Sequence, residues 1–209
     1  MTKKIFAVSV SIIVSVLLAK SSLAADPGAL KNFSADIQTT TTKGNFTSTS
    51  KIISKDGKQR IEHSARGRET VNILRPDKKV VWMLMPDRKT YMEMPLDARN
   101  QDILSKMHDP TIKTDKEFLG NEIVDGHPAR KYHVTTIRDG KKETSGFIWE
   151  ASDLNNFPVK YQNEDKTVTI VWKNIKFEKA PDSFFEIPAG YKKMEMPMRG
   201  MDNPGMPGR

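Results

Sequence analysis

Methionine has the most unusual distribution of any residue in this sequence. Of the eleven methionines, five lie near the C-terminus and four lie in one short stretch, at Met83, Met85, Met92 and Met94. Thioethers are soft ligands for Cu(I), and methionine side chains also form adaptable apolar surfaces. Because the chain has no Cys and no closely spaced His to complete a copper site, we expect an apolar surface and keep Cu(I) binding as the less favoured alternative.

Side chains that perform covalent or metal chemistry are sparse. The chain has no Cys, no Gly-x-Ser-x-Gly motif and no Gly-rich loop between a strand and a helix. The sequence therefore contains no motif typical of nucleophilic catalysis or of nucleotide binding. No metal-ligand spacing relates the histidines, which are His63, His108, His127 and His133. We therefore expect no catalytic residue, no metal and no cofactor, and we do not expect an enzyme.

The charge of the chain does not indicate a nucleic-acid partner. Lys and Arg number 34 against 26 Asp and Glu, which gives a formal net charge of +8. Loss of three lysines with the leader described below would leave +5, and both signs are interspersed along the chain. One basic group is suited to a lipid headgroup or an acidic partner, but a solvated, charged strand edge is the favoured interpretation. Its members are Arg60, Arg66, Arg68 and Arg75.

The first 24 residues have the three parts of a secretory signal. A positive start containing Lys3 and Lys4 precedes an uncharged, mostly apolar stretch over residues 5–19, and Ser22 and Ala24 are small residues at the −3 and −1 positions of a cleavage site. This stretch is shorter than the ~20 apolar residues that a bilayer-spanning helix needs. We therefore expect cleavage after Ala24 and a soluble, periplasmic monomer.

Strands must position most of these residues. Apolar and polar residues alternate with period two from Phe33 onward, and Asp-Gly pairs recur between the runs as tight hairpin turns. The pattern predicts an antiparallel meander of about eleven strands in one domain over residues 25–193. Their expected ranges are 31–41, 46–54, 58–65, 69–75, 79–85, 89–94, 112–119, 129–138, 142–149, 157–163 and 167–177.

Two segments interrupt the strand pattern. Asp97 is suited to cap a helix over residues 98–108, which carries Met107 on its narrow apolar face. A Pro-Asp pair before Phe184 and Phe185 favours a short helical turn that buries at least one of the two rings. These helical segments are expected to lie across the sheet.

The C-terminal residues 194–209 have no apolar period. Met, Pro and Gly mix there with charged residues, so we expect a disordered tail. Its removal is expected to leave thermal stability almost unchanged.

The methionine-containing hairpin is the expected ligand site. Period two places Met83 with Met85, and Met92 with Met94, on one face of their respective strands. The sequence leaves open the register that decides whether the two pairs share a face. If they do, they form one wall for an apolar ligand. The candidate ligand-binding residues are Trp82, Met83, Met85, Tyr91, Met92, Met94, Met107 and Trp172.

Four stretches carry a resemblance to a known superfamily. They are residues 71–79, residues 82–86 with 91–95, residues 119–122 with 129–132, and residues 182–191. In their order and spacing, the chain resembles the periplasmic outer-membrane lipoprotein carriers (LolA/LolB-like), and most closely their uncharacterised lipoprotein-sorting-like members. The resemblance implies a mainly β fold, with a curved antiparallel sheet that forms an unclosed half-barrel and one or two short helices across its concave face.

The resemblance also implies a function. In the carriers, the hollow of the half-barrel shields the acyl chains of lipoproteins, and the superfamily includes a sensor of envelope stress. We therefore expect a non-catalytic periplasmic protein that holds an apolar ligand, a lipid or lipoprotein acyl chains by burying apolar surface. The alternative is an envelope interaction or stress-sensing module with a protein partner.

Overall fold

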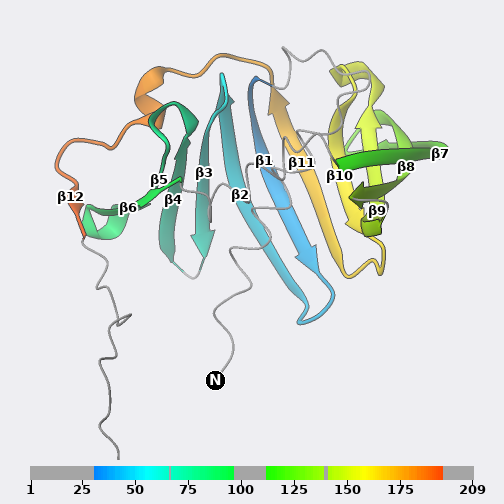
Figure 1. The fold of residues 1–209 in the computed structure, drawn as a ribbon, viewed down its shortest axis with the longest axis horizontal. Helices are drawn as coiled ribbons and strands as arrows, with labels where there is room; N and C mark the ends of the chain where they lie inside the picture. The colour runs from blue at the N-terminus through cyan, green and yellow to red at the C-terminus, as the bar shows by residue number, and fades with distance from the viewer. Residues whose placement is uncertain (1–30, 66, 97–111, 139–140, 195–209) are drawn as a thin grey trace, which may run out of the picture.

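The structure is a computed structural model that describes residues 31–65, 67–96, 112–138 and 141–194 (Figure 1). The expected leader, the expected helix over residues 98–108 with Met107, and the expected tail beyond Met194 lie outside the described residues.

The described residues form one sheet of twelve strands, in the order β12-β6-β5-β4-β3-β2-β1-β11-β10-β9-β8-β7. Neighbouring strands are antiparallel except β6 and β12, which are parallel. Each of the eleven expected strands overlaps an observed one, and the short β12 is additional. The strands are β1 (Asn32–Thr41), β2 (Phe46–Lys55), β3 (Lys58–Ala65), β4 (Arg68–Arg75), β5 (Val80–Met85), β6 (Thr90–Pro95), β7 (Ile112–Val124), β8 (His127–Arg138), β9 (Lys141–Ala151), β10 (Phe157–Asn163), β11 (Val168–Lys176) and β12 (Lys192–Lys193).

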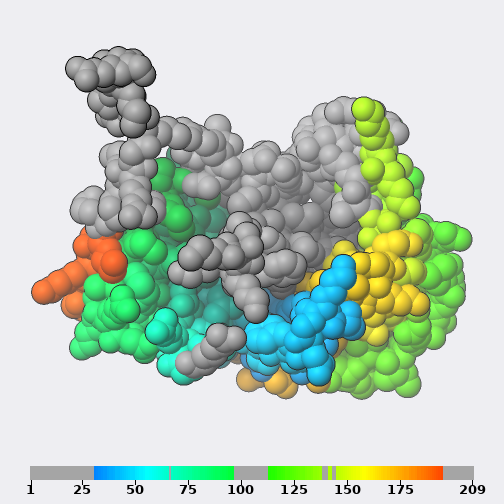
Figure 2. Space-filling model, turned by 90° about the horizontal axis from the view of Figure 1, so that it is seen from below, coloured from blue at the N-terminus to red at the C-terminus, as the bar shows by residue number. Residues whose placement is uncertain are grey.

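The sheet consists of two meanders joined at β1. Strands β1 to β6 form one meander and β7 to β11 form the other, and β1 pairs with both β2 and β11. In Figure 1, β1, β2, β3 and β11 stand side by side, whereas the strands at both ends turn away from this plane. In Figure 2 the described residues at the two ends rise beyond the middle of the sheet. The fold is therefore a strongly curved, unclosed antiparallel sheet, as expected.

The turns follow from their residue types. At the β2–β3 turn, Asp56 and Gly57 have φ values of 49° and 85°, which is the left-handed pair that a two-residue hairpin turn needs. The β4–β5 and β5–β6 connections are short 3-10 turns, η1 (Pro76–Lys78) and η2 (Pro86–Arg88). Each begins with proline, whose fixed φ suits the first helical position. This repeated connection sets β5 between β4 and β6.

Two clusters of buried side chains stabilise the sheet. The larger one is centred on β1, β2 and β9 to β11, and includes Trp149 and Trp172. The smaller one joins β2, β4 and β5 to the C-terminal segment through Ile53, Val71, Ile73, Trp82, Leu84, Ala180 and Phe185. The expected short helical turn is present as η4 (Asp182–Phe185). It buries Phe185 completely, whereas Phe184 is 43% exposed.

Candidate functional site

The register of the β5–β6 hairpin puts all four methionines on one face of the sheet. Met83 lies directly opposite Met92, Val81 lies opposite Met94, and Met85 lies opposite Thr90. Directly opposed residues of an antiparallel pair project to the same side. All four methionine side chains are half-buried, so they form a continuous thioether surface.

This surface continues across the sheet. The pairing places Met83 opposite Asn72, Asn72 opposite Ile61, and Ile61 opposite Ile52. We call the apolar side that contains this row the methionine face. Its apolar residues on β1 to β6 and β11 include Phe33, Ala35, Ile37, Phe46, Ile52, Ile61, Leu74, Val81, Met83, Met85, Met92, Met94, Val168, Ile170 and Trp172. On β1, β2 and β11 they are buried, except Phe46 and Val168 near the strand ends, and on β3 to β6 they are half-buried. The methionine end of the face is therefore more accessible than its centre.

Charge is almost absent from the methionine face. Among the described residues of β1 to β6 and β10 to β12, its charged residues are Arg68, at the exposed start of β4, and the exposed Lys192, beside Thr90 at the β12 edge. The charged residues of these strands otherwise lie on the opposite face, and they include Asp36, Lys51, Lys55, Arg60, Glu62, Arg75, Glu93, Lys160 and Lys173. An anionic ligand group would meet a counter-ion only at these two exposed positions and none among the described side chains in the middle of the face.

A neutral polar pair lies within the methionine face. Ser50 Oγ is 2.6 Å from His63 Nδ1, and burial lowers the pKa of His63 below its ordinary value of 6.5. Serine hydrogen-bonded to histidine is a potential nucleophile and base. However, β2 and β3 are interior strands whose backbone N–H groups are used in the sheet, so this part of the described sheet offers no preformed oxyanion hole. The pair therefore acts as a small neutral polar patch.

Two further polar atoms on this face are buried without a hydrogen-bond partner. They are Trp172 Nε1, at the β11 end, and Thr90 Oγ1, at the β6 end. The Trp172 side chain is completely buried. A buried donor without a partner is costly, which makes the Trp172 indole the exceptional polar group of the face.

The structure separates the predicted ligand residues. Trp172 shares a face with the four methionines, whereas Trp82 and Tyr91 project to the opposite side. Trp82 is buried in the smaller cluster, and Trp82 Nε1 donates to Glu93 Oε2 at 2.9 Å. Tyr91 packs against the same cluster. Trp82 and Tyr91 therefore pack on the side of the sheet opposite the methionine face and are not part of that face.

Arg75 attaches the C-terminal segment behind the methionine hairpin. Its side chain is 5% exposed, and Nη1 donates to Glu186 Oε1 and to the Phe185 carbonyl at 2.6 and 2.8 Å. The guanidinium group also pairs with Asp77, and this hydrogen bond lowers the pKa of the Asp77 carboxyl from 3.8 to about 2. Arg75 thus fixes the β4–β5 turn to the segment that covers Trp82.

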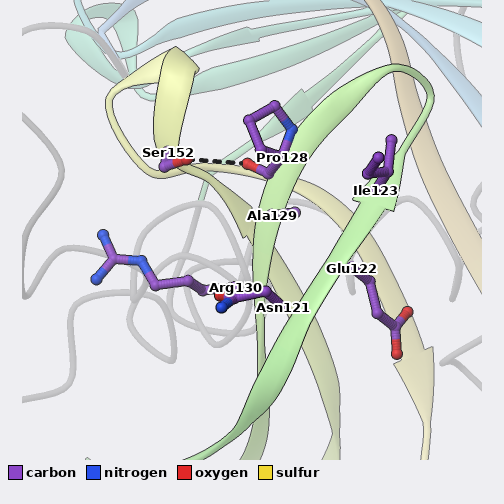
Figure 3. Close-up of a pocket in the computed structure, with 7 residues that line it drawn as sticks. All are labelled: Asn121, Glu122, Ile123, Pro128, Ala129, Arg130 and Ser152. Atoms are coloured by element: carbon purple, nitrogen blue, oxygen red, sulfur yellow. Dashed lines mark hydrogen bonds between the residues drawn. The ribbon is translucent and has the colours of Figure 1, made fainter.

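A hollow lies at the β7–β8 turn, away from the methionine face (Figure 3). Its charged residues already have partners within the protein. Glu122 accepts from Lys131 and from Trp149 Nε1, and Arg130 donates to Asn156 at 2.7 Å. Because these groups are satisfied internally, the hollow has little unmet hydrogen-bonding capacity for a ligand.

A metal-binding cluster and a membrane-spanning helix are both absent from residues 31–65, 67–96, 112–138 and 141–194. Within these ranges, no three His, Asp or Glu side chains are grouped closely enough to hold a metal ion. No helix in the described part of the chain has the length and hydropathy to cross a bilayer.

Solved structures match this chain at low sequence identity, and the first one described here shares its fold. An uncharacterized conserved protein from Thermus thermophilus matches with a TM-score of 0.53 and 10% identity, over 90% of this chain and 98% of that one. A LolA superfamily protein from Nitrosomonas europaea matches with a TM-score of 0.38 and 14% identity, over 83% and 96% of the two chains. The lipoprotein LppX from Mycobacterium tuberculosis matches with a TM-score of 0.44 and 12% identity, over 84% and 98%.

Sequence comparison gives the family directly. No curated protein matches this chain in sequence. The family model described as "Domain of unknown function (DUF4412)" matches residues 33–157, which is more than half of the chain. The chain therefore belongs to the DUF4412 family.

Proposed function

We propose that this protein is a non-catalytic periplasmic binding protein that holds an apolar ligand or an acyl chain on the methionine face. The observation that carries the proposal is the register that joins four half-buried methionines to an uncharged apolar surface. Unbranched, polarizable methionine side chains adapt to ligands of varied shape. Burial of apolar ligand surface stabilises the complex by roughly 25 cal/mol per Å². No covalent step is involved.

The periplasmic setting rests on the secretory signal read in residues 1–24. A carrier of apolar molecules is useful in an aqueous compartment, because it removes the ligand from water. Charge on the ligand face is confined to Arg68 and Lys192 at its exposed margins. The middle of the face therefore favours hydrocarbon over a charged headgroup, since burying an unpaired charge is costly.

The test is binding of the neutral fluorescent probe N-phenylnaphthylamine to the full chain. We expect Met83→Gln combined with Met92→Gln to weaken probe binding while the protein stays folded, because two polar amides then interrupt the apolar row. Ile123→Gln is the control for a polar substitution elsewhere, since Ile123 is 79% exposed and lies on β7, at the other end of the sheet from β5 and β6. Unchanged probe affinity in the folded double variant would remove the hairpin from the site.

A second candidate function is an envelope interaction module, and the β7 edge favours it. β7 is a terminal strand of the sheet, and three of its apolar residues are exposed, Phe118 at 54%, Leu119 at 47% and Ile123 at 79%. An open edge with apolar side chains is suited to pairing with an extended segment of another protein. A stable protein partner lost in Phe118→Lys, with probe binding retained, would favour this function.

A further inference from the structure

The indole of Trp172 is a donor with no acceptor, located on the proposed ligand face. Trp172 lies opposite Ile37 in the β1–β11 pair, and no described group accepts a hydrogen bond from Nε1. The tryptophan N–H can only donate a hydrogen bond, whereas a hydroxyl group can either donate or accept one. A ligand oxygen placed here would relieve an unmet hydrogen bond, whereas a pure hydrocarbon would leave it unmet.

The surroundings of Trp172 select the kind of oxygen. Its neighbours on the face include Ile37, Ile170 and Tyr161, and the described strands on both sides place no Lys or Arg beside it. His63 lies on β3, and its lowered pKa keeps it neutral near pH 7. A carboxylate or phosphate would therefore be buried without a counter-ion, which is unfavourable. A neutral carbonyl oxygen fits the same donor without that cost.

We propose, on the basis of the function proposed above, that the ligand is a long apolar chain with a neutral ester or ketone carbonyl, and that Trp172 Nε1 donates to this carbonyl. Five strand spacings separate β11 from β5, which corresponds to about 24 Å along the sheet. The carbonyl lies at the buried β11 end, and the hydrocarbon crosses β1 to β4 toward the methionines. The ligand therefore has a fixed direction on the face.

The experiment measures displacement of the neutral probe N-phenylnaphthylamine from the full-length protein at pH 8. The three competitors are a long-chain methyl ester, the free fatty acid and the alkane, all with the same number of carbon atoms in the hydrocarbon chain. The ester is expected to displace the probe about ten-fold better than the alkane, because it satisfies the buried donor. It is also expected to exceed the ionised acid. In Trp172→Phe, an aromatic side chain remains but the N–H donor is lost, so the ester and the alkane should become equal.

Thr90→Val is the matched control, because it removes the other unpartnered polar atom, at the opposite end of the face. The ester preference is expected to survive this change. Equal displacement by ester and alkane in the parent, strongest displacement by the acid, or loss of the preference only in Thr90→Val would each overturn the inference and leave the proposed function standing. Failure of all three competitors would instead contradict the proposed function. Displacement by the alkane serves as an internal control for a folded site in each variant.

Discussion

Phe185 provides the sharpest test of how the C-terminal segment stabilises the sheet. Its side chain is 0% exposed and packs with Trp82 and Leu84 in the smaller cluster. Its carbonyl accepts from Arg75 at 2.8 Å, and this backbone contact is kept in Phe185→Ala. The substitution therefore deletes a buried ring without removing a polar partner. Large-to-small changes of this kind cost ~3–5 kcal/mol.

Urea unfolding followed by tryptophan fluorescence measures this cost. With an m value of ~2 kcal/mol/M, the midpoint of Phe185→Ala should fall by roughly 1.5–2.5 M relative to the parent. Phe184→Ala is the matched control, because the neighbouring ring is 43% exposed, and its free energy of unfolding should change by less than ~0.5 kcal/mol. Equal midpoints for the two variants, or a larger loss in Phe184→Ala, would refute the packing described for η4.

Two further predictions concern polar groups behind and within the methionine face. Arg75→Met should lower the free energy of unfolding by ~1–3 kcal/mol, because the buried Phe185 carbonyl loses its donor. Lys78→Met, at a side chain 43% exposed, should cost less than ~1 kcal/mol in the same urea assay; equal losses would contradict the role given to Arg75. Burial lowers the pKa of His63 in the folded state below the ordinary 6.5, so the unfolded chain binds the proton more readily than the folded chain. The stability that is present above pH 6.5 is therefore lost as the pH falls toward the folded-state pKa. Urea midpoints at pH 7.5 and 5 should therefore differ less in His63→Gln than in the parent, and an identical pH dependence in the two proteins would exclude His63 as its source.

Much of the fold was predictable because one physical pattern recurs along the chain. Period-two alternation and turn residues were sufficient for eleven strands, since a half-buried antiparallel strand requires both. β7 runs to Val124, five residues beyond its expected end. The cause is the irregularity between Phe118 and Gly120, where Gly120 has a φ of 145° and the register shifts. Such a bulge reverses the alternation, and the pattern is lost locally.

The two lysines of β12 could not be predicted from their own residue types. Their parallel pairing with Thr90 and Tyr91 of β6 depends on where the C-terminal segment crosses the sheet. This path is set by the buried contacts of Phe185 with Arg75 and with the smaller cluster, whose residues on β2, β4 and β5 are distant from Phe185 in sequence. Tertiary packing therefore decides this strand, as it commonly overrides local preference.

The candidate site was predictable in composition but not in geometry. The spacing of Met83 and Met85 predicted that both side chains project from one face of their strand. Only the observed register shows that Met92 lies on the same face. Trp82 was grouped with them because it is adjacent in sequence, although adjacent residues of a strand project to opposite faces. In β1 to β3 the charged residues occupy alternate positions, and this pattern predicts that the other face of these strands has few charges. The unpartnered Trp172 donor has no sequence signal, because it depends on all neighbouring groups.

Native mass spectrometry tests the central claim most directly. The full chain, produced with its leader and purified gently from the periplasm without detergent, should carry an additional mass from a neutral apolar molecule. That mass should be lost in the folded Met83→Gln, Met92→Gln double variant and kept in Ile123→Gln, which changes an exposed residue of β7. A parent protein that shows only its own polypeptide mass, or a double variant that retains the bound molecule at the parent's occupancy, would contradict ligand binding on the methionine face.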